Sequence, residues 1–97
     1  MSEKLGFLAH RQGDMVAIAV RDVEVGQEEF AYLDSSARTS IQVTEPILLG
    51  HKVALVDIAK GTAVIEYGQP VGVAQADIAT GAMVHVHNIR SAKWQLA

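Results

Sequence analysis

The 97-residue sequence contains no cysteine. It therefore forms no disulfide, offers no thiolate to a metal ion and has no cysteine nucleophile. Aromatic residues are scarce, with two Phe, two Tyr and one Trp, so the core has to be built mainly from small branched side chains. This length is nonetheless enough for a core without disulfide or zinc cross-links, and we expect a single domain over residues 1–97.

The sequence also lacks a basic run and a long apolar segment. Eight Lys and Arg residues stand against eleven Asp and Glu residues, for a net charge of −3, which argues against nucleic-acid binding. The apolar run Met15–Val20 is far too short to span a bilayer. Residues 1–6 lack the pattern of a signal peptide. We expect a soluble cytoplasmic protein with neither nucleic acid nor membrane as a partner.

Motifs for nucleotide binding and for autonomous hydrolysis are missing as well. The sequence contains no Gly-rich phosphate loop, no Gly-x-Gly-x-x-Gly and no Gly-x-Ser-x-Gly. Its hydrophobic fraction of 49% and mean hydropathy of +0.19 are high for so short a chain. Such an apolar excess either reflects a partner that covers part of the surface or is simply the composition of a small β domain.

What the sequence does contain is a series of short strand-like segments. No stretch longer than about ten residues keeps an apolar face at the helical period, and the tail beyond Asn88 is the one helix candidate. About seven short strands with Gly between them predict an all-β fold with little helix. The predicted strands are Met15–Val20, Phe30–Leu33, Arg38–Thr44, Lys52–Val56, Ala63–Tyr67, Pro70–Ala74 and Met83–His87.

One segment of eight residues is partly repeated twenty residues later. Residues 57–64 read Asp-Ile-Ala-Lys-Gly-Thr-Ala-Val, and residues 77–84 repeat five of those eight positions. Residues 22–26 keep the Asp, an apolar neighbour and the Gly. An Asp can accept a hydrogen bond from a backbone N–H two residues on, and Gly supplies a positive φ. The repeat therefore predicts tight Asp-to-Gly corners between strands.

Several blocks of sequence, taken in order, resemble the small SAF domain of the altronate and galactarate dehydratase family. The likeness is strongest to the altronate branch and to the small subunit of sulfolactate sulfo-lyase, is dense over residues 49–94 and is loose over residues 22–48. The galactarate branch generally lacks the His-x-His-Asn ending found here. The blocks are Phe7–His10, Gly13–Ala17, Leu49–Leu55, Asp57–Gly61, Val64–Gly68, Val71–Ala74, Val84–Asn88 and Arg90–Trp94.

The resemblance implies a β-clip fold and a part in a metal-dependent lyase. Such a lyase removes a proton next to the carboxylate of a hydroxy-carboxylic acid and expels water or sulfite. In the sugar-acid dehydratases this domain is normally fused to a much larger catalytic region, whereas this chain ends at Ala97. A separate large catalytic subunit is therefore expected as a partner, and a homo-oligomer stays open. The resemblance suggests iron as the metal, although two histidines would suit zinc or manganese as well.

The last predicted strand carries the densest group of metal-competent side chains. His85 and His87 are two residues apart, so on a strand both imidazoles would point to the same side, about 7 Å apart. They could bind one divalent metal together, or divide metal binding and proton transfer between them. Asn88 could hold a substrate hydroxyl or carboxylate. Alternatively, these residues form only the polar face of a terminal strand.

Two further pairs have both a functional and a structural interpretation. His51 and Lys52 follow a Gly and could clamp a substrate carboxylate, or they could be a turn residue and an exposed strand residue. Asp57 and Asp77 could form a carboxylate pair, but their identical place in the repeat favours a role as corner formers.

The remaining polar positions are less specific. The geometry of His10 and Asp14 is open because a turn separates them, and residues 66–67 suit a turn and core more than an acid and base. In the tail, residues 89–97, Arg90 and Trp94 could contact a partner, or Trp94 could cap the core.

Three functions follow from these patterns. In the first, the chain is the small subunit of a lyase, and His85, His87, His51, Lys52 and Asn88 complete a site carried largely by the partner. In the second, it is a stand-alone module that binds a sugar acid or a metal without catalysis. In the third, it is a structural assembly subunit in which the corners are scaffold.

Overall fold

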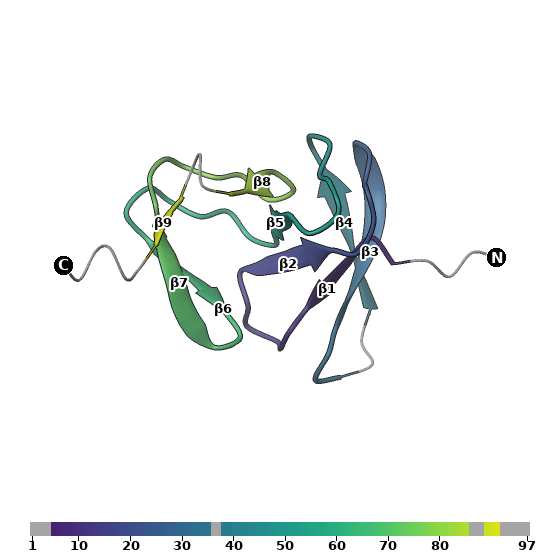
Figure 1. The fold of residues 1–97 in the computed structure, drawn as a ribbon, viewed down its shortest axis with the longest axis horizontal. Coiled ribbons are helices and arrows are strands. Elements are labelled where there is room, and N and C mark those ends of the chain that lie inside the picture. Colours follow the sequence, from purple (N-terminus) through teal and green to yellow (C-terminus); the bar gives the residue numbers. More distant parts are fainter. Residues whose placement is uncertain (1–4, 36–37, 86–88, 92–97) are drawn as a thin grey trace.

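The computed structural model describes residues 5–35, 38–85 and 89–91, and over these residues the chain is entirely β (Figure 1). This confirms the predicted all-β, β-clip-like fold. In this part of the chain no helix is long and apolar enough to cross a membrane. The strands are β1 (Phe7–Ala9), β2 (Val16–Ala19), β3 (Gly26–Tyr32), β4 (Arg38–Val43), β5 (Lys52–Ala54), β6 (Ala63–Glu66), β7 (Gln69–Ala74), β8 (Met83–Val84) and β9 (Ile89–Ser91).

The strands form two sheets, of which the smaller lies at the left of the view in Figure 1 and the larger extends from its centre to the right. The larger sheet has the order β4-β3-β1-β2-β5-β8, and the smaller has the order β6-β7-β9. All pairings are antiparallel except β1 with β3. The chain leaves the larger sheet after β5, builds β6 and β7, returns at β8 and ends in the smaller sheet at β9. Residues 55–62 and 75–82 are the first two of the three connections between the sheets.

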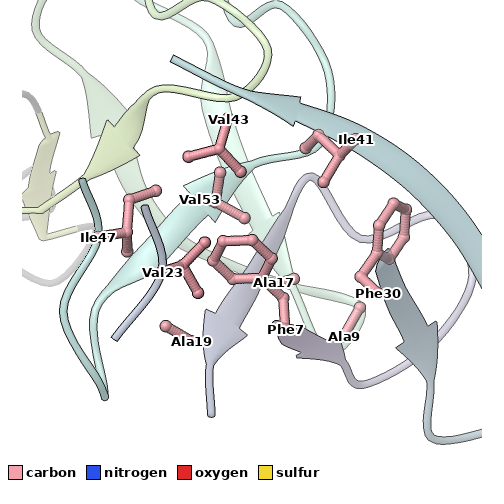
Figure 2. Packing of buried hydrophobic residues seen from close by; sticks show 10 residues of the cluster. All are labelled: Phe7, Ala9, Ala17, Ala19, Val23, Phe30, Ile41, Val43, Ile47 and Val53. Carbon is pink, nitrogen blue, oxygen red and sulfur yellow. The ribbon is translucent and has the colours of Figure 1, made fainter. Parts of the chain in front are cut away.

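Two clusters of buried side chains make up the core. Phe7 lies at the centre of the first, with Ala17 and Val53 among its neighbours in the cluster (Figure 2). The second cluster includes Val16 and Ala54. Strands β2 and β5 therefore send alternate residues into the two clusters, and both of their faces are buried. This explains why the sequence around these strands is apolar without alternation.

The strand assignments differ from the sequence-based expectation at both ends of the chain. Phe7–Ala9 forms a strand that lies between β2 and β3, and Ile89–Ser91 forms β9 against β7. The expected helix beyond Asn88 is therefore wrong for Ile89–Ser91, because their backbone groups pair with the edge of a sheet. Strand β8 also ends at Val84, short of the predicted end at His87.

The two copies of the repeat lie against each other. Ile58 and Ile78 exchange two backbone hydrogen bonds, both of 2.7 Å from N to O. Oδ1 of Asp57 accepts from the backbone N–H of Thr80 at 2.9 Å, and Oδ1 of Asp77 accepts from that of Lys60 at 2.9 Å. The expected corner role of the two Asp residues is confirmed. The expected donor two residues on is wrong, since each carboxylate bonds to the other copy.

A second pair of corners in the larger sheet follows the same plan. Val23 and Ile47 exchange backbone hydrogen bonds of 2.8 and 2.9 Å, and Oδ1 of Asp22 accepts from the N–H of Leu49 at 2.9 Å. The corner that begins at Pro46 has a proline where the other corners have Asp, so it has no carboxylate to accept a hydrogen bond from its partner corner. For that reason the sequence repeat does not reveal it.

An Ala three residues before each Asp completes the motif. These residues are buried at the ends of β2, β5 and β7, and each carbonyl accepts a hydrogen bond from the Gly of the opposite corner. The pairs are Ala19 with Gly50, Ala54 with Gly81, and Ala74 with Gly61, at 2.8 to 2.9 Å. The full corner is thus Ala-x-x-Asp followed by Ile or Val, a signal present three times in the sequence.

Substitution of Gly81 by Ala tests how tightly the corners pack. Gly81 and Gly61 have nearly equal φ values of 89° and 86°, so Ala costs about 1–2 kcal/mol of backbone strain at either position. A Cβ on Gly81 would also lie 1.9 Å from the carbonyl oxygen of Gln42, whereas one on Gly61 meets nothing within 4 Å. In urea denaturation we expect Gly61→Ala to stay folded and Gly81→Ala to lose most of its stability. Equal midpoints would contradict this packing.

The lowered pKa of Asp57 predicts that the folded protein loses stability at acidic pH. The backbone N–H of Thr80, and then its hydroxyl at 2.8 Å, lower the pKa of Asp57 below its ordinary value of 3.8. Because the pKa is lower in the folded state, this group stabilises the fold above pH 3.8, and the contribution disappears as the pH falls through the folded-state pKa.

In Thr80→Val the pKa of Asp57 should rise toward 3.8, because one hydrogen bond to the charged form is lost. An NMR titration of the Asp57 side-chain carboxyl carbon measures this. Thr62→Val is the matched control and should leave the pKa unchanged. A pKa that does not move in Thr80→Val would contradict the role of the hydroxyl.

Candidate functional site

A buried carboxylate organises the turn between β6 and β7. Asp14, 4% exposed, accepts hydrogen bonds from the backbone N–H groups of Tyr67 at 2.8 Å and Gly68 at 3.2 Å. Both turn residues have positive φ, 58° and 72°, as a two-residue type I′ hairpin turn requires. Asp14 thus connects the β1–β2 loop to the turn of the smaller sheet. The sequence left the geometry of Asp14 open, and the structure gives it this anchoring role.

The ring of Tyr67 contacts two side chains that are, or can become, cationic. Its ring centroid is 4.8 Å from that of His10 and 4.8 Å from the guanidinium carbon of Arg11. The three residues, with Leu33 and Asp34 of the β3–β4 loop, line an open depression of about 420 Å³. Its lining residues come from the β1–β2, β3–β4 and β6–β7 connections, which all lie on the lower side of the view in Figure 1.

Glu66, at the end of β6, joins this depression to β5. One carboxylate oxygen is 3.8 Å from Nε2 of His10, and the other is 3.7 Å from Nζ of Lys52. Only 13% of the Glu66 side chain is exposed. A half-buried carboxylate attracts a neighbouring ammonium group and a protonated imidazole, but neither distance is short enough for a direct hydrogen bond.

The imidazoles of His51 and His85 lie next to each other, with ring centroids 4.5 Å apart and planes inclined at 44°. The register of β5 and β8 explains this contact, because Lys52 pairs with Val84 and the next pair outward is His51 with His85. Nδ1 of His51 is buried and has no hydrogen-bond partner among the described residues. The pair is therefore assembled by tertiary structure from residues 34 positions apart in the sequence.

His51 and Lys52 make different contacts in the structure. Successive residues of a strand point to opposite faces, and accordingly His51 meets His85 whereas Lys52 meets Glu66. A joint clamp on one carboxylate, the sequence-based expectation, would need a side chain to leave its present partner. The expected assignment of each residue to substrate binding stays a prediction.

Several predicted site residues lie outside the part of the chain that is described. These are His87, Asn88 and Trp94, while for Arg90 only the backbone is described, paired with Val73 in the smaller sheet. Their roles in catalysis, metal binding and partner contact therefore stay predictions. Among the described residues, no group of three or more His, Cys, Asp or Glu side chains could hold a metal ion.

Sequence reasoning missed the role of Glu66 and passed over Arg11. Residues 66–67 suited a turn and core, and Arg11 carried no motif. Neither position has a local signal, because Glu66 meets partners 56 and 14 residues away and Arg11 meets Tyr67 across two loops. The one available hint was a Tyr directly before a Gly at a hairpin turn, where Asn or Asp is usual.

Paired Asp-to-Gly corners and two curled sheets define a small β-clip domain. The chain belongs to the family described as the altronate/galactarate dehydratase SAF domain, which it matches over residues 5–92.

Two kinds of characterised relative share this domain. The chain is 45% identical to altronate dehydratase of Escherichia coli (strain K12) over 78 residues and 39% identical to that of Bacillus subtilis (strain 168) over 82 residues. These matches cover 80% and 84% of the chain but only 15% of each dehydratase. It is also 34% identical to (2R)-sulfolactate sulfo-lyase subunit alpha of Chromohalobacter salexigens, over 93% of the chain and 98% of that subunit.

Replacement of Asp14 tests whether its carboxylate holds the turn beneath the depression. Asp14→Ala removes the acceptor of two N–H groups and should lower the free energy of unfolding by about 1–3 kcal/mol. Asp34→Ala is the control, since this exposed carboxylate accepts a single long bond of 3.4 Å and its loss should cost no more than about 0.5 kcal/mol. Urea denaturation compares the two, and equal losses would contradict the anchoring role.

Proposed function

We propose that this chain is the small subunit of a lyase that acts on a hydroxy-carboxylic acid, with an active site shared with a separate large subunit. The observation that carries the proposal is the match to a sulfo-lyase subunit alpha over 98% of that subunit's length. The altronate dehydratases, which carry the same domain within 15% of their length, support dehydration of a sugar acid as the reaction.

The residues of this chain suit a supporting part in such a reaction. Removal of a proton next to a carboxylate builds negative charge on the substrate, and cationic or hydrogen-bonding groups must stabilise it. The His51–His85 pair, Lys52 and Glu66 offer imidazole, ammonium and carboxylate groups along neighbouring strand ends. His85 is exposed, so a partner subunit can reach it.

We also propose that a divalent metal, iron by the family resemblance, takes part in this site. The fit is partial. His51 and His85 bring two imidazoles together, and the unpartnered Nδ1 of His51 is a free nitrogen ligand. Two ligands are too few for a resident metal site, so the large subunit would supply the others. A bound metal would stabilise the charge that develops at the substrate carboxylate.

The proposal is tested by reconstitution. The tagged chain is purified from its own source, and the proteins that it retains are identified and assayed for release of water from sugar acids and of sulfite from (2R)-sulfolactate. One larger protein in stoichiometric amount, with either activity present only in the complex, supports the shared site. Full activity of the large protein without this chain would contradict it.

Substitution of His85 tests the site within that complex. We expect His85→Ala to lower kcat by about 10²- to 10⁴-fold, the range for loss of a group that transfers a proton, and to leave the fold intact because the side chain is exposed. His87→Ala is expected to act in the same way. Gln75→Ala, an exposed residue whose side chain donates to the carbonyl of Val73, is the control. Unchanged turnover in both histidine variants would overturn the assignment.

A further inference from the structure

We propose that the depression around Tyr67 is a subsite for an acid with a single carboxylate and several hydroxyl groups, as in the sugar-acid class. This inference rests on the proposed function and names the substrate class for it. Arg11 would hold the carboxylate, the carboxylate of Asp34 would accept hydroxyl groups, and the exposed ring of Tyr67 would pack against the carbon chain.

Arg11 supports this subsite because its guanidinium has no carboxylate partner among the described residues. Arg21 and Arg38 each have a carboxylate at 2.7 Å, and Lys52 has one at 3.7 Å. Arg11 is exposed and lies over Tyr67, and it has no ion pair with any carboxylate of the described residues. The contact with the Tyr67 ring engages no carboxylate, so the N–H donors of this guanidinium stay available, and they match a carboxylate with two parallel bonds.

The strained backbone conformation of Tyr67 also supports this subsite. Among the described residues it is the one non-glycine with positive φ, a conformation that costs about 1–2 kcal/mol. Asp14 stabilises this turn, and Tyr67 is 58% exposed. Such strain, where the surrounding structure enforces it, is concentrated at functional sites. The strained turn holds the Tyr67 ring against Arg11 and His10 before any ligand arrives.

The acidic group in the same depression supports this subsite as well. Asp34 accepts one long bond of 3.4 Å from the N–H of Gln12 through Oδ2, and an ionised carboxylate has acceptor capacity beyond that single bond. It would accept hydroxyl groups of a sugar acid but repel a second anionic group. The depression therefore favours a polyhydroxy monocarboxylate over an acid that carries both a carboxylate and a sulfonate.

The subsite also adjoins the proposed active site. His10 lines the depression and lies 3.8 Å from Glu66, which in turn lies 3.7 Å from Lys52. Lys52 is next in sequence to His51 of the imidazole pair. An acid bound at Arg11 would thus lie beside His10, and the contacts of Glu66 with His10 and Lys52 lead from there to the ammonium group assigned to the chemistry. The imidazole of His51 lies on the opposite face from Lys52 and is not part of this series.

The test is a titration of the isotopically labelled full chain with D-gluconate, followed by backbone amide NMR. We expect shifts confined to the amides around Arg11, Leu33 and Tyr67, with D-sorbitol, which lacks the carboxylate, giving none. Arg11→Ala should raise the Kd for D-gluconate by at least about tenfold, the loss expected for a charged hydrogen-bonded contact. Arg11→Lys should weaken binding in the same direction, because the ammonium cannot form two parallel bonds. Arg38→Ala, which removes an arginine paired with Glu29, should leave the Kd unchanged.

(2R)-Sulfolactate tests the substrate class. We expect it to bind with a higher Kd than D-gluconate. In Asp34→Asn, which removes the repelling charge, the difference between the two Kd values should become smaller. No shifts at the depression, a Kd unaffected by Arg11→Ala, or tighter binding of sulfolactate would overturn the inference. Because binding is measured on this chain alone, that failure is distinct from failure of the lyase reconstitution, which needs the large subunit.

Discussion

The pairing of the two Asp-to-Gly corners at Ile58 and Ile78 is the contact on which the rest of the structure depends. These corners lie on two of the three connections between the sheets, and each supplies hydrogen-bond partners of the other. Both Ile side chains are buried in the second core cluster. The same hydrogen bonds therefore satisfy the backbone of two loops, place two core residues and set the position of the smaller sheet against the larger one.

The position of the smaller sheet decides which polar groups meet. Strand β6 brings Glu66 to Lys52 of β5 and to His10 after β1, and the following turn brings Tyr67 onto Arg11. The site residues are thus carried by short strand ends on a hydrogen-bonded framework rather than by long loops. Such a framework holds these side chains in place without a ligand, which lowers the ordering cost of any binding event.

The all-β class, most of the strands and the corner role of Asp57 and Asp77 could be predicted from the sequence. These features depend on residues close together in the sequence, namely short apolar segments, Gly positions and an eight-residue repeat. The corner that starts at Pro46 escaped because its Asp is replaced, and β9 was mistaken for a helix because its pairing with β7 has no local sign. The resemblance to the SAF domain family came from ordered blocks of residues and was confirmed over residues 5–92.

The sequence by itself determined the elements of this protein, since strand propensity, glycine conformation and the Asp corners are properties of a few neighbouring residues. Only the tertiary structure decided the partners. It turned each Asp toward the other copy of the repeat, set His51 against His85, and enclosed Glu66 between His10 and Lys52. The physical reason is that such contacts join residues between 14 and 56 positions apart, and their geometry follows from strand register and from the packing of two sheets, not from residue type.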